Sequence, residues 1–226
     1  MISKDLTKRL ITSLVLIFLL GLSFNYSIIL IILLILVSLI SWLEFNGLIS
    51  KIFKKKNNKN SFYKLLTNIL SLFYLSIFSL LIYFSVSQDN FKLIILFLFS
   101  ICICSDIGGL LFGKYFKGKK LTKISPNKTI SGSIGSFILS LILVPIFTRY
   151  LNMQFVNIYD LILIVIIVSF LCQIGDLFIS FLKRKAKIKD TGKILPGHGG
   201  LLDRIDGMLL AIPFGILVWE FFIFTI

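Results

Sequence analysis

The sequence predicts an all-α, polytopic membrane protein with about seven transmembrane helices. Of its 226 residues, 57% are apolar and only 15% are charged. The apolar residues are not periodic but gather in uncharged stretches of roughly 20 residues, and at about 1.5 Å rise per residue each stretch can cross a hydrocarbon core of about 30 Å. The charged residues lie mainly in the short segments between these stretches, which is typical of a chain whose solvent is lipid.

The first apolar stretch is too long for a single span. Leu10 to Leu43 contains no charged residue over 34 positions, which corresponds to about 51 Å of helix. We therefore expect two spans with a turn near Ser23 to Tyr26, where polar and flexible residues gather. The N-terminal segment resembles a signal peptide in its basic start, but no small-residue cleavage pattern follows, so we expect it to remain as the first span.

The remaining apolar stretches supply five further spans. Their expected limits are Leu65 to Gln88, Leu93 to Gly113, Thr129 to Thr148, Leu161 to Leu182 and Gly207 to Ile226.

The distribution of basic residues predicts the orientation of these spans. The chain has 24 Lys and Arg residues, and 22 of them lie in the N-terminus and in the loops 51–64, 114–128 and 183–204. In a seven-span topology these four segments lie on one side, which the positive-inside rule makes cytoplasmic. We therefore expect a multi-pass protein of the cell (inner) membrane with a cytoplasmic N-terminus.

The net charge of +14 limits the classes of partner. In a soluble protein such a charge suggests nucleic acid, but here the basic residues sit in short loops beside the membrane, without a nucleic-acid motif. They indicate contact with anionic lipid headgroups instead. The three cysteines lie in apolar stretches without zinc or redox spacing and are expected to be core residues.

Four acidic residues lie in or beside predicted spans at similar depth. Asp106 lies eight residues before Lys114 and Asp176 lies seven before Lys183, both near the cytoplasmic ends of their spans, and Asp203 and Asp206 open the last span. A carboxylate near the centre of a membrane helix costs roughly 2.5 to 3.5 kcal/mol, so such residues are functional candidates. Pairing with a neighbouring Lys or Arg, or capping of a helix N-terminus, is the alternative for each of them.

Helical spacing extends Asp176 into a polar stripe. Gln173, Ser180 and Lys183 share its helix face. Converging carboxylates repel one another unless a cation neutralises them, and all-oxygen ligands favour Mg²⁺ over zinc. The stripe therefore predicts a site for one or two Mg²⁺ ions, with a monovalent cation left open, and chemistry at phosphorus.

Two glycine-bearing loops lie on the same predicted side. Ser125 to Gly132 precedes a span, so that its backbone N–H groups and Lys128 could receive a phosphate, or it could form an ordinary turn and helix cap. Pro196 to Gly200 surrounds His198, the only histidine of the chain, and allows close approach of a ligand or simply makes a turn.

The last third of the chain resembles the phosphatidate cytidylyltransferases, also called CDP-diacylglycerol synthases. Their signature positions all occur here at the family spacing, namely Ser180, Lys183, Arg184, Lys189, Asp190, Pro196, His198, Gly199, Gly200, Asp203, Arg204 and Asp206. The likeness covers about Asp106 to Asp206 well. It implies one membrane domain over residues 1–226, with N-terminal spans in about 1–105 and the catalytic core in about 106–226.

The resemblance implies a nucleotidyltransferase that makes CDP-diacylglycerol and pyrophosphate from CTP and phosphatidate, with Mg²⁺, in phospholipid biosynthesis. It assigns metal binding to Asp176, Asp203, Asp206 and Ser180. Its predicted catalytic set is Asp176, Asp203, Asp206, Lys183 and His198. The predicted contacts with CTP and phosphate are Ser125, Lys128, Lys183, Arg184, Lys189 and Arg204. A homodimer is left open.

Some features depart from the family pattern, and other functions remain as alternatives. Relatives carry a glutamate where this chain has Ser131, and the chain is short for the family. A CTP-dependent polyprenol or phytol kinase resembles the same superfamily, and an ion transporter is the rival from another class. A CDP-alcohol phosphotransferase is excluded, because the residues that should follow Asp206-Gly207 are absent.

Overall fold

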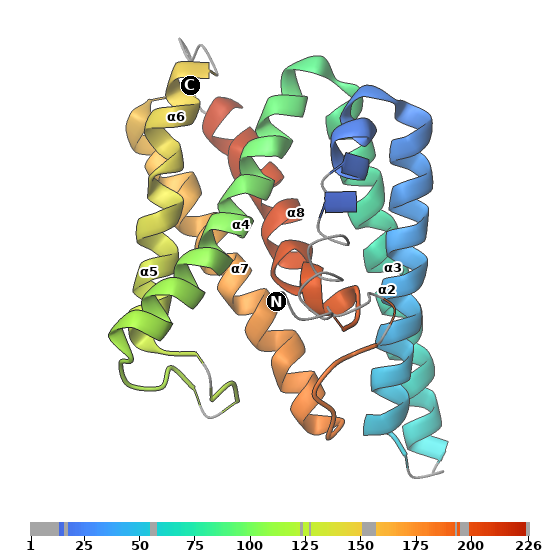
Figure 1. Cartoon of the computed structure of the whole chain (residues 1–226). Coiled ribbons are helices and arrows are strands. Elements are labelled where there is room, and N and C mark those ends of the chain that lie inside the picture. The colour runs from blue at the N-terminus through green and yellow to red at the C-terminus, as the bar shows by residue number, and fades with distance from the viewer. Residues whose placement is uncertain are drawn as a thin grey trace, which may run out of the picture. The chain divides into compact units, whose positions relative to one another are not determined.

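The computed structural model confirms the all-helical fold. The residues that it describes are 14–15, 18–54, 58–122, 124–126, 128–150, 157–192, 194 and 199–224. Its helices are α2 (Ser27–Ile52), α3 (Asn58–Ser87), α4 (Asp89–Phe116), α5 (Ile130–Leu141), α6 (Leu143–Tyr150), α7 (Ile158–Lys185) and α8 (Leu202–Phe224) (Figure 1).

Six of the described segments are long and apolar enough to cross a membrane, which makes this a multi-pass membrane protein. Five of the predicted spans correspond to α3, α4, the α5–α6 pair, α7 and α8, and α2 corresponds to the second half of the long N-terminal stretch. Residues 10–13 and 16–17 of the predicted first span lie outside the described part. Residues 18–25 are helical, and the helix is interrupted at Tyr26, within the predicted turn.

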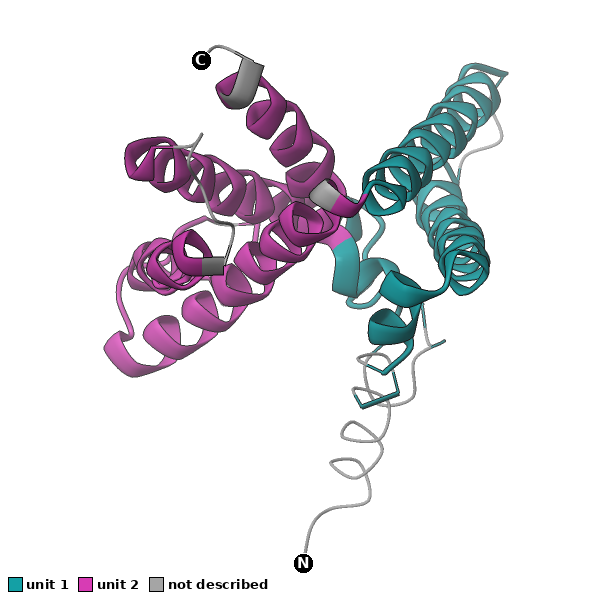
Figure 2. Cartoon of the chain, turned by 90° about the horizontal axis from the view of Figure 1, so that it is seen from above, with its two compact units in different colours: residues 1–88, 182–205 teal, residues 89–181, 206–226 magenta. Residues whose placement is uncertain are grey.

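The described helices form two compact units. Unit 1 contains residues 1–88 and 182–205, and unit 2 contains residues 89–181 and 206–226 (Figure 2). The last turn of α7 and the first turn of α8 are therefore grouped with α2 and α3.

Unit 1 is built on a polar seam between α2 and α3. The Trp42 indole N–H donates to the Asn68 carbonyl at 3.2 Å, and the Asn68 amide donates to Asn46 Oδ1 at 3.0 Å. A small apolar cluster of Leu48, Ile49 and Ala186 joins α2 to the segment that follows α7. Between helices that both face lipid, hydrogen bonds and close packing supply the association that a hydrophobic driving force cannot.

Unit 2 packs its helices through small residues. The Ser105 and Ser169 hydroxyls, on α4 and α7, lie 3.0 Å apart, and Ser136 of α5 donates to the Ser105 carbonyl at 2.7 Å. Phe97 and Trp219 pack edge to face in the apolar part of this unit. The helix pair α5–α6 is interrupted at Ile142, because Pro145 has no N–H to donate to Leu141 four residues earlier.

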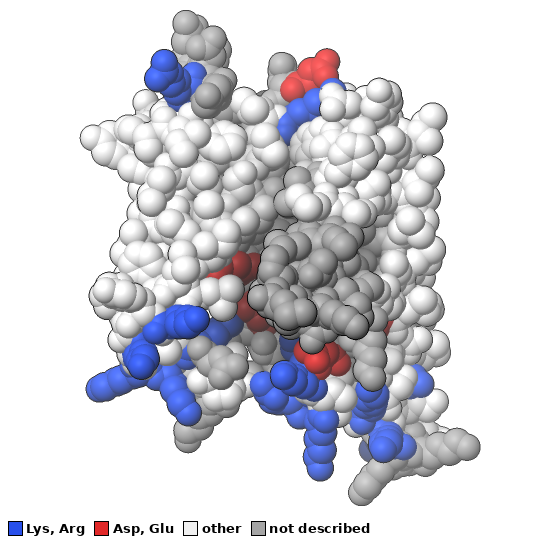
Figure 3. All heavy atoms as spheres, in the orientation of Figure 1, with Lys and Arg blue, Asp and Glu red and all other residues white. Residues whose placement is uncertain are grey.

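Glycines bring α4 and α5 into backbone contact. A Cβ atom at Gly108 would lie 2.4 Å from the Gly135 carbonyl oxygen, and one at Gly135 would lie 2.3 Å from Phe112 Cβ. The two helices run in opposite directions, so Lys114 near the end of α4 and Arg149 near the end of α6 lie at opposite ends of unit 2. Most of the Lys and Arg atoms seen over α4 and α5 gather at the end that carries the α4–α5 loop (Figure 3).

Replacing Gly135 by alanine should destabilise the protein. The new Cβ overlaps Phe112 at the root of its side chain, so α4 and α5 must separate, at a cost of about 1–3 kcal/mol. Gly47→Ala is the matched control, because nothing lies within 4 Å of a Cβ at that helical position. The control should be neutral or stabilising by up to ~1 kcal/mol. Unfolding of the detergent-solubilised variants by sodium dodecyl sulfate measures both, and equal stabilities would contradict the close α4–α5 packing.

Candidate active site

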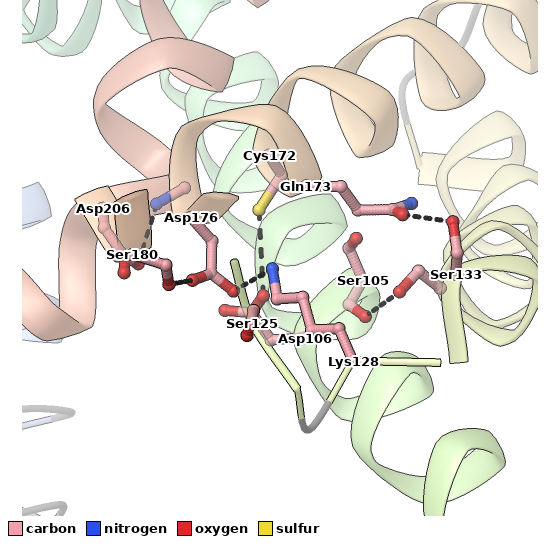
Figure 4. Close-up of polar contacts among 12 residues, drawn as sticks. Ser105, Asp106, Ser125, Lys128, Ser133, Cys172, Gln173, Asp176, Ser180 and Asp206 are labelled. Carbon is pink, nitrogen blue, oxygen red and sulfur yellow. Dashed lines mark hydrogen bonds and ion pairs between the residues drawn. The ribbon is translucent and has the colours of Figure 1, made fainter. Parts of the chain in front are cut away.

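Three carboxylates of unit 2 lie at the same end of its helices. Asp106 is on α4, Asp176 on α7 and Asp206 on α8 (Figure 4). All three were singled out from the sequence.

Glycines set the crossing of α7 and α8 beside these acids. A Cβ atom at Gly175 would lie 2.6 Å from the Asp206 carbonyl oxygen, and one at Gly207 would lie 2.5 Å from Cys172 Sγ. Only glycine allows so close an approach of the two backbones. Because Asp176 and Asp206 are the sequence neighbours of these glycines, the crossing brings the backbones of the two acids close together.

Asp176 is held on both of its oxygens. Ser180, one turn along α7, donates to Oδ1 at 3.3 Å, and the Lys128 ammonium group forms an ion pair with Oδ2. The side chains of Asp176 and Lys128 are 28% and 26% exposed, so the pair is only partly screened by solvent. The Asp106 and Asp176 side chains both point toward this ammonium group (Figure 4), and Asp106 Oδ1 lies 3.9 Å from the Cys172 sulfur.

The loop between α4 and α5 delivers Lys128 to the carboxylates. Leu121 N–H donates to the Lys128 carbonyl at 2.8 Å, and Ile130 N–H donates to the Lys119 carbonyl at 2.9 Å, so the two sides of the loop are paired. Thr129 then caps α5 by accepting the Gly132 N–H at 3.1 Å. The turn and helix cap that were left open in the sequence are therefore present, and Lys128 contacts a carboxylate.

Gln173 extends the polar stripe of α7 as predicted. Its Oε1 accepts a 2.5 Å hydrogen bond from Ser133 of α5, and its buried Nε2 has no partner among the described atoms.

Asp203 belongs to unit 1 and is neutralised within it. Its Oδ1 accepts from Lys183 Nζ at 2.8 Å, and its Oδ2 accepts the backbone N–H groups of Thr191 at 2.8 Å and Gly200 at 3.2 Å. Lys183 and Asp203, both predicted as site residues, therefore pair with each other.

Glu44 is a residue of this region that the sequence reasoning did not single out as functional. It lies on α2, is 6% exposed, and accepts hydrogen bonds from Thr191, Leu201 and Leu202. The available signal was an uncompensated acid seven residues before Lys51, inside an apolar helix.

The other predicted site residues lie in or beside the α7–α8 connection and the α4–α5 loop. Arg184, Lys189 and Arg204 have exposed side chains, and Ser125 is half-buried, its backbone N–H donating to Thr122 Oγ1 at 3.3 Å. His198 lies outside the described residues.

The donor set of unit 2 fits a hard divalent cation in its chemistry. Among the described residues, no three His, Cys, Asp or Glu side chains enclose a metal position. The Asp106, Asp176 and Asp206 carboxylates nevertheless lie at one end of the helices of unit 2, and the Lys128 ammonium group forms an ion pair with Asp176 (Figure 4). Carboxylate oxygens are the ligands that Mg²⁺ takes in proteins, usually few in number and completed by water and phosphate.

Comparisons with known proteins agree with the sequence resemblance. A model of the Cytidylyltransferase family matches residues 2–222. The chain is 44% identical over 149 residues to a phosphatidate cytidylyltransferase of Rickettsia typhi, covering 62% of this chain and 65% of that protein. It is 43% identical over 132 residues to one of Staphylococcus haemolyticus, covering 58% of this chain and 50% of that protein.

A third relative, the phosphatidate cytidylyltransferase of Bacillus subtilis, is 46% identical over 108 residues, covering 45% of this chain and 40% of that protein. The chain thus spans 65% or less of the length of these three curated relatives.

The Lys128–Asp176 pair should contribute measurably to stability. Removing Lys128 alone leaves a half-buried carboxylate short of positive charge, so we expect a double-mutant cycle of Lys128→Met and Asp176→Asn to give a coupling energy of about 1–2 kcal/mol. The control cycle uses Lys92→Met and Asp89→Asn, whose pair is largely exposed and screened by solvent, so that it should show no measurable coupling. Unfolding in sodium dodecyl sulfate gives both cycles, and equal coupling in the two would contradict the interior position of the first pair.

Proposed function

Because the chain belongs to the cytidylyltransferase family, we propose that it is a membrane enzyme that makes CDP-diacylglycerol and pyrophosphate from CTP and phosphatidate. The match of the family over residues 2–222 carries this proposal. The position of Asp106, Asp176 and Asp206 at one end of the helices of unit 2, with Lys128 paired to Asp176, supports it, because acids at the end of apolar helices suit a reaction between a soluble nucleotide and a lipid phosphate.

In the proposed reaction a phosphate oxygen of phosphatidate attacks the α-phosphorus of CTP. The bond from that phosphorus to the bridging oxygen of the β-phosphate breaks, and pyrophosphate leaves with the electron pair. Both reactants are anions, so their approach requires positive charge at the site. We propose that Lys183, Arg184, Lys189 and Arg204, with Ser125 and Lys128, contact the nucleotide and lipid phosphates.

A divalent cation, Mg²⁺, is proposed to bind Asp176 and Asp206, with Ser180 in support and with one or two ions per site. When bound, such an ion offsets charge on the phosphates. Asp203 is proposed to bind metal as well, although its oxygens accept hydrogen bonds from Lys183, Thr191 and Gly200. His198 stays a predicted contributor to the site.

The proposed setting is the cell (inner) membrane, with the site facing the cytoplasm. The concentration of Lys and Arg in four segments of the sequence supports this orientation through the positive-inside rule. The same residues suit contact with anionic lipids.

The protein should transfer label from the α-phosphate of CTP to lipid. Purified protein in mixed micelles with phosphatidate and α-labelled CTP should give chloroform-soluble label that depends on Mg²⁺, with an equal amount of pyrophosphate. With γ-labelled CTP the lipid should stay unlabelled. Lipid labelled from the γ-phosphate would replace the proposal with a lipid kinase, and absence of transfer by a folded protein would reject both.

Loss of a proposed metal ligand should abolish turnover without unfolding the protein. Asp176→Asn and Asp206→Asn remove negative charge from the proposed site, so kcat should fall by about 10²–10³-fold or more. Asp160→Asn is the matched control, since Asp160 is in the first turn of α7, at the opposite end of that helix from Asp176. It should retain activity within about twofold. Near wild-type rates in both Asp176→Asn and Asp206→Asn would show the metal assignment to be wrong.

A further inference from the structure

Glu44 of α2 is a buried acid for which the proposed reaction has no direct use. Only 6% of the residue is exposed, although it lies in one of the most apolar helices of the chain. Its Oε1 accepts the Leu201 N–H at 3.1 Å, and its Oε2 accepts the Leu202 N–H at 2.8 Å and the Thr191 hydroxyl at 3.0 Å. The charge is thus held by N–H and O–H donors that come from the connection between α7 and α8.

Two of these donors belong to the start of α8. The first N–H groups of a helix have no partner within it and need an outside acceptor. A carboxylate in that place also interacts favourably with the positive end of the helix dipole. Glu44 therefore caps α8 from a helix that lies more than 150 residues earlier in the chain.

Asp203 supplies the complementary bond at the same helix start. Its Oδ2 accepts the Gly200 N–H, three residues back, as the acid of a capping box does. In an ordinary capping box the residue at the position of Gly200 contributes a side chain that accepts an N–H of the first turn. Gly200 has no side chain, and the carboxylate of Glu44 takes that role.

The other end of the α7–α8 connection is tied to the same two acids. Thr191 donates its N–H to Asp203 and its hydroxyl to Glu44. A Cβ atom at Gly192 would lie 2.2 Å from Glu44 Oε1, and one at Gly200 would lie 2.6 Å from Oε2, so glycine at both positions lets the carboxylate enter. Glu44, Thr191, Gly200 and Asp203 together close the base of this loop, and we refer to them as the loop clasp.

We propose that Glu44 is a positioning residue for cytidylyl transfer, acting through the loop clasp on the direction of Asp203 and on the first turn of α8. This inference rests on the proposed function. Glu44 contacts the loop and no reacting group. Without its carboxylate the first N–H groups of α8 lose their charged acceptor, and the Thr191 and Gly200 donors that orient Asp203 are no longer held in place. The helix that carries Arg204 and Asp206 then begins less regularly.

The test uses full-length Glu44→Gln protein in detergent, which keeps the side-chain size but lacks the charge. We expect kcat to fall by about 10–100-fold, as for a misplacement of about 1 Å, while KM for CTP and for phosphatidate changes by less than about threefold. Hydrogen–deuterium exchange without metal or substrate should show the amides of 200–206 exchanging at least about tenfold faster, with those of α5 unchanged.

Two further variants separate the possible outcomes. Asp89→Asn removes an exposed acid at the start of α4 and should match the wild type in both measurements. Thr191→Val removes the hydroxyl from the loop clasp while leaving the Glu44 charge, and should give an intermediate loss of kcat and of amide protection. This variant decides the question if Glu44→Gln does not fold.

Wild-type kcat and protection in Glu44→Gln and in Thr191→Val would overturn the proposal. Loss of activity without faster exchange at 200–206 would also overturn it, because Glu44 would then act directly on the substrates. If the wild type itself transfers no cytidylyl group, the proposed function fails, whereas the exchange measurement still decides whether Glu44 holds the loop.

Discussion

The structure depends on the requirement that a carboxylate placed among apolar helices must have its charge met within the protein. An acid in the middle of a membrane helix costs roughly 2.5 to 3.5 kcal/mol. The protein meets this cost in three ways. Asp176 forms an ion pair with the Lys128 ammonium group. Asp203 accepts hydrogen bonds from Lys183 and from two backbone amides. Glu44 accepts hydrogen bonds from two backbone amides and a hydroxyl. Each set of donors includes groups from a segment that joins two helices, so the acids specify the conformation of those segments.

Close packing of helices makes this neutralisation possible. Where α7 and α8 cross, Gly175 and Gly207 let two backbones meet, and the acids that follow or precede them are carried to the crossing. The contact of α4 with α5 through Gly108 and Gly135 similarly fixes the hairpin whose loop delivers Lys128. The glycines of these helices thus allow close packing, and through it they also position the acids and Lys128.

Much of the fold follows from the sequence, because the apolar stretches are long and separated by charge. The break of α5–α6 at Ile142 was not predicted, although Pro145 explains it. The acids Asp106, Asp176 and Asp206 were found because a charge in an apolar helix is conspicuous. Their partners were not, because the pairing of Lys128 with Asp176 and of Lys183 with Asp203 depends on how loops fold back on helices. Glu44 was not assigned a function, although it is also an acid in an apolar helix, because its donors, two backbone amides and the Thr191 hydroxyl, lie far along the chain.

The capping of α8 by Glu44 also bears on how the chain assembles. The carboxylate is synthesised 157 and 158 residues ahead of the two amides that bind it. At a synthesis rate of roughly 5–20 residues per second, α2 remains in or beside the bilayer for about ten seconds or more before the donors to this acid exist. Among the hydrogen bonds of the described residues the contact is one of the most non-local, and it carries the entropic cost of closing a long loop. The α2–α3 hairpin therefore lacks part of its stabilisation during synthesis. Glu44 gains its hydrogen-bond donors only after α7, the loop that follows it and the start of α8 have been made.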